Sequence, residues 1–247
     1  MQYQGGKTIV GKYIAPFVDE ALEKTEGRYV EPFVGSCSLL HRLNNVTSAE
    51  LSDVHRGLIS MHQAYQEGWR PKAEITEEEY KQLKKENRGD PWSTFISFAC
   101  AFGGIEWGSF ARWDPVRSPS QGRPYPYITA AHNAIKRKWE GTIDQPHIEF
   151  IHRSFFDVGP KESSTIYCDP PYANTQKYKV GDFDTEAFYD HCEHLASKGH
   201  IVLVSEFSNP RGYEVLWSKE RKVTMARKAS DYKTKKELLL KVDNPKK

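Results

Sequence analysis

The stretch from Arg28 to Val54 reads RYVEPFVGSCSLLHRLNNVTSAELSDV, and its pattern decides the fold class. Apolar runs bounded by turn residues indicate strands, and a 3.6-residue apolar period indicates helices. These signals predict, in order, a strand over Arg28–Phe33, a turn at Gly35, a helix over Ser36–Leu43, a strand over Thr47–Ser52 and a helix over Val54–Gln66. Strands that alternate with helices in this way are typical of a parallel α/β sheet.

The regular alternation of strands and helices stops in the middle of the chain, and strands return in the last hundred residues. Further strands are predicted over His147–His152, Ser164–Cys168, His200–Glu206 and Lys236–Val242, with a helix over Thr185–Ala196. Between them we expect a charged helix over Glu77–Glu86, an apolar helix over Trp92–Phe102, a loop or hairpin over Gly103–Tyr127 and a helix over Thr129–Trp139. We therefore expect a core domain from residues 1–67 and 146–247, with residues 68–145 inserted as a separate unit.

Composition excludes several classes of protein. The 247 residues include 38% apolar and 13% aromatic side chains, enough to bury a sizeable core. No apolar run approaches the roughly 18 residues that span a bilayer, and the first residues lack the apolar region of a secretory signal. The four cysteines form no Cys-x-x-Cys pair, which argues against a disulfide scaffold or a cysteine-rich zinc site. We expect a cytoplasmic protein without a membrane partner.

The formal net charge of +2 hides an uneven distribution. From Lys219 to Lys247 there are eleven Lys or Arg residues and four acids, and from Glu106 to Glu140 there are six and three. In the second segment the basic residues alternate with tryptophans and tyrosines. Such mixtures suit nucleic acid, because phosphates attract cations and exposed bases stack on flat rings. A solvated basic tail and an ordinary aromatic core would look the same.

The predicted strand Ser164–Cys168 runs directly into Asp169-Pro170-Pro171-Tyr172. Ligands of open α/β sheets bind beyond the carboxyl ends of the strands. Proline lacks an N–H donor, so this turn offers a carboxylate, free carbonyls and an aromatic ring. These groups fit a planar ring that carries an exocyclic amine. Hydrogen bonds from the amine to Asp169 and to the Pro170 carbonyl would make its nitrogen nucleophilic.

Five motifs occur in one order along the chain: Tyr3-Gln-Gly-Gly-Lys7, Glu31-Pro-Phe-Val-Gly35, Ser52-Asp-Val54, Ser154-Phe-Phe-Asp157 and Asp169-Pro-Pro-Tyr172. In sequence and order they resemble the Dam-type (D12 class) family of N6-adenine-specific DNA methyltransferases. That resemblance implies a Rossmann-like fold dependent on S-adenosylmethionine. It also implies that the insertion is a target recognition domain, mostly helical with a hairpin, and that double-stranded DNA is the partner.

The resemblance also implies the roles of individual residues. The catalytic set is Asp169, Pro170, Pro171 and Tyr172, and the cofactor set is Tyr3, Gly6, Lys7, Pro32, Phe33, Gly35, Asp53, Ser154, Phe155 and Asp169. We expect the DNA-binding residues to include Arg112, Arg117 and Arg123.

Each role has a plainer alternative. Asp53 lies 18 positions beyond Gly35 (53 − 35), near the spacing at which an acid meets a ribose hydroxyl, but it could instead cap the following helix. Lys7 could be a solvated terminal lysine, and Tyr3 and Phe155 could be core residues. Cys37 stands where the family usually has a second glycine, and the family's recognition stretch before the hairpin is missing, so the target sequence GATC does not carry over.

Three further expectations complete the prediction. His191 and His194 lie three apart on a predicted helix without further ligands nearby, so we expect no metal. We expect a monomer, and a partner restriction endonuclease would be encoded separately. Alternative functions are methylation of cytosine N4 or of RNA, a silent nucleic-acid-binding relic, and, least favoured, a nicotinamide oxidoreductase.

Overall fold

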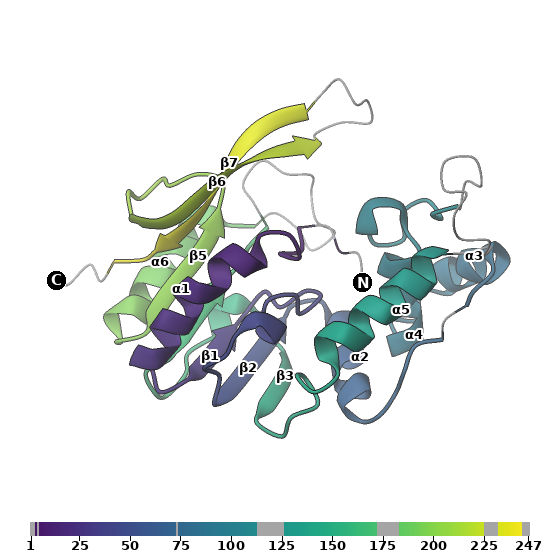
Figure 1. The fold of residues 1–247 in the computed structure, drawn as a ribbon, viewed down its shortest axis with the longest axis horizontal. Coiled ribbons are helices and arrows are strands. Elements are labelled where there is room, and N and C mark those ends of the chain that lie inside the picture. Colours follow the sequence, from purple (N-terminus) through teal and green to yellow (C-terminus); the bar gives the residue numbers. More distant parts are fainter. Residues whose placement is uncertain are drawn as a thin grey trace. The chain divides into compact units, whose positions relative to one another are not determined.

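The computed structural model describes residues 3, 5–72, 74–112, 126–171, 183–224 and 232–243 (Figure 1). The helices are α1 (Gly11–Lys24), α2 (Arg56–Gln66), α3 (Glu77–Glu86), α4 (Pro91–Ala99), α5 (Pro126–Trp139) and α6 (Thr185–Ser197), with 3-10 turns η1 (Leu40–Arg42), η2 (Phe102–Gly104) and η4 (Phe155–Asp157). The strands are β1 (Arg28–Glu31), β2 (Ser48–Asp53), β3 (Ile148–His152), β4 (Thr165–Cys168), β5 (Ile201–Glu206), β6 (Glu214–Thr224) and β7 (Tyr232–Lys241).

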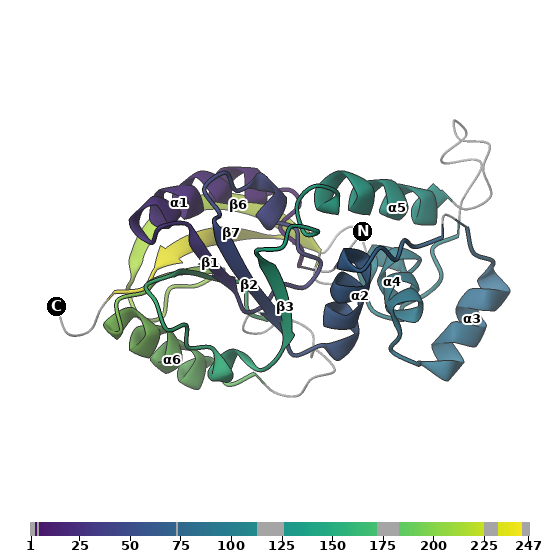
Figure 2. The same ribbon diagram turned by 90° about the horizontal axis from the view of Figure 1, so that it is seen from below.

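These strands form one seven-stranded mixed sheet in the order β3-β2-β1-β4-β5-β7-β6. The pairs β1–β2, β1–β4 and β4–β5 are parallel, and β5–β7 and β6–β7 are antiparallel. Every residue of β4 is buried, as expected of a parallel strand covered on both faces. Figure 2 shows α1 and α6 on opposite faces of the sheet. The structure thus confirms an α/β fold.

The chain divides into two compact units. The first comprises residues 1–11, 34–42 and 53–152, and the second comprises residues 12–33, 43–52 and 153–247. In the first, α2, α4 and α5 contribute fully buried side chains such as Leu58, Phe95 and Trp139. In the second, Ile166, Phe188 and Val204 lie in one apolar cluster. The division into a catalytic domain of residues 1–67 and 146–247 and an insertion of residues 68–145 stays a prediction.

Most predicted elements occur within a few residues of their expected ends, but the helix predicted over Ser36–Leu43 is wrong. The structure has only the 3-10 turn η1 there. Gly35 and Cys37 have φ values of +47° and +48°. A left-handed residue cannot continue a right-handed helix, so this segment forms a sequence of turns instead.

Two elements have no counterpart in the predictions. Helix α1 contains Pro16 in its interior, a residue that argues against a helix when only sequence is considered. Strand β6 is rich in Lys and Glu, and it lies at the edge of the sheet beside β7. Because an edge strand has one neighbour and is often charged, it lacks the apolar signature that identifies β4.

The loop or hairpin predicted over Gly103–Tyr127 is confirmed up to Arg112, whereas its last two residues, Pro126 and Tyr127, belong to α5. Ala101 and Phe110 form an antiparallel bridge, and the Ala111 N–H donates to the Cys100 carbonyl at 2.8 Å. Residues 113–125 lie outside the described part. No helix among the described residues is long and apolar enough to cross a membrane.

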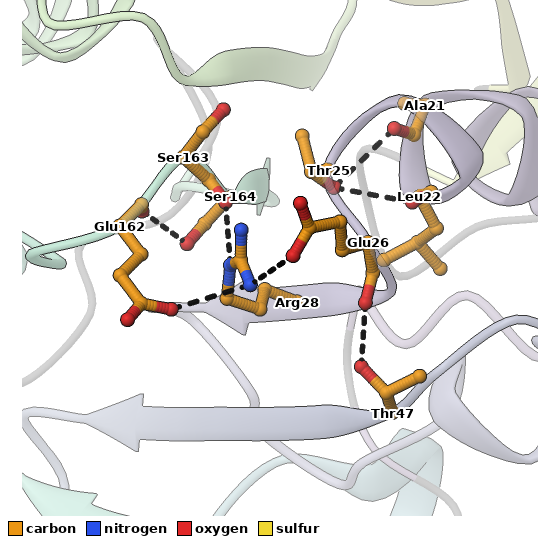
Figure 3. A network of polar contacts seen from close by, with 9 residues as sticks. All are labelled: Ala21, Leu22, Thr25, Glu26, Arg28, Thr47, Glu162, Ser163 and Ser164. Carbon is orange, nitrogen blue, oxygen red and sulfur yellow. Dashed lines mark hydrogen bonds and ion pairs between the residues drawn. The ribbon is translucent and has the colours of Figure 1, made fainter.

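A polar network in the second unit joins the start of β1 to neighbouring turns (Figure 3). The Arg28 guanidinium donates to the Ser163 carbonyl at 2.9 Å and pairs with Glu26 at 2.8 Å and Glu162 at 3.2 Å. The Thr47 hydroxyl donates to the Glu26 carbonyl at 2.7 Å. We call these residues the Arg28 network.

Candidate functional site

The N-terminal segment packs against the loop that follows β1. Two features disfavour any residue other than glycine at position 35. The φ angle of Gly35 is positive, and an added Cβ would lie 2.9 Å from the Tyr3 ring. Cys37 adopts φ = +48° although it is not glycine, and it is buried. The loop therefore keeps a glycine-like path at Cys37, at a strain of about 1 kcal/mol.

Asp53, the last residue of β2, binds the backbone of this loop. Its carboxylate accepts hydrogen bonds from the Gly35 N–H at 3.0 Å and from the His55 N–H at 2.8 Å. Burial raises the pKa of Asp53, and these two N–H donors partly offset that rise. The alternative role proposed for Asp53, capping the next helix, belongs to His55, whose Nδ1 accepts from the Leu58 N–H at 3.2 Å.

Lys7 is buried, which rules out the alternative of a solvated terminal lysine. Its backbone N–H donates to the Ser38 hydroxyl at 3.0 Å, and its ammonium donates to the Gly5 carbonyl at 3.4 Å. An added Cβ at Gly6 would lie 3.2 Å from the Tyr3 carbonyl and 3.6 Å from the Ser36 hydroxyl. The N-terminal motif thus packs directly on residues 35–38.

His62 supports the same loop from α2, and the sequence analysis missed it. Its Nε2 donates to the Gly35 carbonyl at 2.9 Å, and its ring stacks on Phe150 with centroids 4.6 Å apart. The side chain is fully buried, and this burial lowers the pKa of His62 to about 4. A histidine on the apolar face of a helix carries no local signal that separates this role from core packing.

A further histidine links the end of β2 to the hairpin after α4. Since Nδ1 of His55 accepts the Leu58 N–H, Nε2 carries the proton and donates to Glu106 at 3.2 Å. Burial lowers the pKa of His55, but the bond and charge of Glu106 outweigh it and leave that pKa raised. His55 also packs against Phe98, which contacts Tyr3.

The second unit places the other motifs at the carboxyl ends of parallel strands. Strands β1 and β4 are paired, with Val30 opposite Ile166. Pro32 and Phe33 follow β1, and Asp169 follows β4, so both segments leave the sheet at the same edge. Asp169 and Pro171 are partly exposed and Pro170 is buried. Tyr172 lies outside the described residues.

The strand that carries Asp169 is anchored firmly. Tyr167 is fully buried, and its hydroxyl lies 2.7 Å from the Ser205 hydroxyl on β5. Burial raises the pKa of Tyr167, and the nearby charge of Asp169 raises it further. Asp169 therefore follows closely on a buried residue that is hydrogen-bonded to the neighbouring strand.

Phe33, Ser154 and Phe155 lie together beside this edge. The rings of Phe33 and Phe155 stack with centroids 5.2 Å apart, and Phe188 contacts both. Phe155 is buried, so it packs in the core of the unit, which was the alternative weighed for it. The Ser154 hydroxyl accepts the Phe156 N–H at 3.3 Å and caps η4.

Of the predicted DNA-binding residues, only Arg112 is described. Its guanidinium makes two bonds, at 2.8 and 2.6 Å, to the carboxylate of Glu77 on α3. Arg117 and Arg123 lie outside the described part. His191, considered as a metal ligand, donates its Nε2 hydrogen to the Val158 carbonyl at 3.1 Å.

The predicted residues thus occur in two groups, one in each unit. Tyr3, Gly6, Lys7, Gly35 and Asp53 contact one another through the loop, and they all lie in the first unit. Pro32, Phe33, Ser154, Phe155, Asp169, Pro170 and Pro171 lie in the second.

Comparison with known protein families gives a match over the part of the chain that contains the first of these groups. Residues 3–98 match the model of the D12 class N6 adenine-specific DNA methyltransferases. The match contains the N-terminal motif, the Gly35 loop and Asp53, and it ends within α4, before Arg112 and Asp169.

Other comparisons add little. No curated protein sequence matches the chain. A Haemophilus influenzae protein, provisionally described as a methylase, is 10% identical and has a TM-score of 0.37, with coverage of 97% of this chain and 91% of its own. A provisionally described Escherichia coli methyltransferase is 9% identical, with a TM-score of 0.31 and coverage of 93% and 80%. Likenesses of this size identify neither a fold nor an activity.

Proposed function

We propose that this protein transfers a methyl group from S-adenosylmethionine to N6 of an adenine flipped out of double-stranded DNA. The observation that carries the proposal is the position of Asp169-Pro170-Pro171, directly after a fully buried parallel strand, in a chain whose residues 3–98 match an adenine methyltransferase family. The carboxyl end of such a strand is where α/β enzymes place reacting groups.

The residues of the first unit fit the cofactor. Asp53 uses two of its roughly four acceptor positions on backbone N–H groups, so it keeps capacity for ribose hydroxyls. The buried ammonium of Lys7 is suited to the carboxylate of the methionine moiety. The Tyr3 ring offers a face that attracts a sulfonium. When bound, the cofactor supplies a methyl group that is activated by its bond to positively charged sulfur.

The residues of the second unit fit the base. Flipping is required because an adenine inside the stack cannot reach a protein site, and it costs a few kcal/mol. The Asp169 carboxylate and the Pro170 carbonyl each accept one hydrogen of the N6 amine. These bonds direct the nitrogen lone pair away from the ring, and Tyr172 provides a stacking face. Asp169 need not be a strong base, since the N6 proton becomes acidic only once the methyl group is attached.

The decisive variant is Asp169→Ala. We expect it to fold and to bind S-adenosylmethionine, yet to lose methylation by about 100- to 1000-fold or more, because a positioned polar contact to the reacting group is lost. Labelled methyl incorporation measures turnover, and calorimetry measures cofactor binding. Asp169→Asn, which keeps one acceptor oxygen, should retain more activity, and Asp144→Ala removes an exposed acid as the control.

The substrate base is tested with matched duplexes. Incorporation into a duplex that contains adenine, and none into one that lacks it, is the expected result. Incorporation into the adenine-free duplex would assign cytosine N4 as the acceptor, and incorporation only into RNA would assign RNA. Near-normal turnover of Asp169→Ala would contradict the mechanism itself.

A further inference from the structure

Several cations gather around Thr8 in the first unit. The ammonium of Lys138, on the last turn of α5, donates to the Thr8 hydroxyl at 2.9 Å. The Arg42 guanidinium, on η1, donates to the Thr8 carbonyl at 3.2 Å. Arg137 is close enough to His41 and to Lys138 to lower the pKa of each. We call His41, Arg42, Arg137 and Lys138 the Thr8 cation cluster.

Among the described residues, no acid pairs with this cluster. Arg42, Arg137 and Lys138 make no ion pair there, although Lys138 is only 6% exposed. Burial lowers the pKa of Lys138, and the charges of Arg42 and Arg137 lower it further. Burial and the charges of Arg42, Arg137 and Lys138 together lower the pKa of His41 to about 4. Buried lysines are rare in proteins unless an opposite charge accompanies them.

Two polar atoms in the cluster also lack partners. Nε of Arg42 and Nδ1 of His41 are buried, and neither has a hydrogen-bond partner. An added Cβ at Gly11 would lie 3.2 Å from Nε of Arg42, so this side chain rests closely on the backbone at Gly11. A buried donor without a partner costs about 1–3 kcal/mol. An anion at this position would offset both the charge and the missing hydrogen bond.

The positions of the charged residues on α5 indicate which anion. The last turn of α5 carries Lys136, Arg137 and Lys138 in succession, and the first two are exposed. Cations at a helix C-terminus can simply stabilise the helix dipole, but the Lys138 ammonium bonds to Thr8 instead. The cluster thus continues from a buried lysine to exposed cations, which suits a chain of phosphates better than one small anion.

We propose that the Thr8 cation cluster is a phosphate site that holds the backbone of duplex DNA. Arg42 and Lys138 contact the phosphate oxygens, and the exposed Arg137 extends the contact along the strand. This inference rests on the proposed function, because it takes DNA as the ligand. It adds a second location for DNA contacts, on η1 and on the last turn of α5, to the predicted Arg112, Arg117 and Arg123.

The test is the salt dependence of duplex binding, followed by fluorescence anisotropy of a labelled oligonucleotide. Each phosphate contact contributes about 0.9 to the slope of log affinity against log salt concentration. We expect Arg42→Gln and Lys138→Met each to lower the slope by about 1 and Arg137→Gln, an exposed change that does not threaten folding, to lower it as well. The matched control is Arg28→Gln, whose guanidinium is already paired, and it should leave the slope unchanged.

A second readout follows His41 directly. A bound phosphate stabilises the protonated imidazole, so the pKa of His41, about 4 in the free protein, should rise when duplex is added, as measured by NMR titration. The pKa of His62, which is low because of burial, should not move. An unchanged His41 pKa in the complex would contradict the proposal.

The outcomes separate this inference from the proposed function. If the wild type methylates DNA but the three variants keep its slope and affinity, the phosphate site is wrong and the enzyme stands. If the variants lose affinity for S-adenosylmethionine and keep the DNA slope, the cluster holds the cofactor carboxylate, which also overturns the inference. If the wild type neither binds nor methylates DNA, the proposed function is contradicted, and the phosphate site that rests on it is contradicted as well.

Discussion

Two arginines of this protein, Arg28 and Arg42, have opposite surroundings. Arg28 lies among acceptors: a carbonyl and the two carboxylates of Glu26 and Glu162 take its hydrogens (Figure 3). Arg42 has one carbonyl partner and two further cations beside it. Both are partly exposed residues next to turns, so the difference lies in what each region provides for a positive charge.

The two units also differ in their buried polar atoms. In the first unit, three buried side-chain nitrogens, on His41, Arg42 and His62, have no hydrogen-bond partner among the described residues. The Arg28 network closes on itself, as a purely structural network does. The Thr8 cation cluster leaves positive charges and buried nitrogens without partners, and this is the reason for proposing a phosphate there.

The largest expected effect is a loss of folding stability at low pH. His62 has a pKa of about 4 in the folded protein and about 6.5 when unfolded. Below pH 6.5 the unfolded chain therefore binds a proton that the folded chain does not, and stability is lost as the pH falls to about 4. The loss is about 3 kcal/mol, and His41 acts in the same direction.

Urea unfolding at pH 6.5 and 4.5 checks this prediction. His62→Gln removes the titrating group while keeping an amide donor for the Gly35 carbonyl, so its stability should depend less on pH than that of the wild type. Equal pH dependence in both proteins would show that His62 is not held neutral.

The second prediction is that two substitutions change the free energy of unfolding in different directions. Arg28→Met removes a guanidinium from its acceptors and should lower the free energy of unfolding by about 1 kcal/mol. Lys138→Met removes a buried cation that repels its neighbours, and it should be neutral or raise that free energy by about 1 kcal/mol without DNA. Chemical denaturation of both variants measures the two changes. A clear loss in Lys138→Met would mean that the lysine is a structural residue like Arg28.

The smallest effect belongs to Arg112. Because Glu77 already binds its guanidinium through two bonds, Arg112→Gln should change the salt slope of DNA binding by less than Arg42→Gln does. Glu77→Gln should release Arg112 and modestly raise DNA affinity. Duplex titrations of the three variants decide this. A larger loss in Arg112→Gln than in Arg42→Gln would reverse the ranking of paired and unpaired cations.

Part of the candidate site could be predicted from short motifs. Gly35, Asp53 and the N-terminal Tyr3 and Lys7 were expected to act together, and the structure brings them into contact. Their role in cofactor binding stays a prediction. The prediction of a helix after Gly35 was wrong, because a cysteine gives no indication in the sequence that Cys37 adopts a left-handed conformation.

The sequence by itself determined the α/β class and most of the strands and helices, from β1 and β2 to α3, α5 and α6. These depend on apolar periodicity and on caps, which act over a few neighbouring residues. Only the tertiary structure placed His62 beneath Gly35 and brought Lys138 to Thr8, 130 positions away. The physical reason is that the residue type of a charged or polar side chain does not show whether that side chain has a partner. The packing of segments that are distant in the sequence decides this.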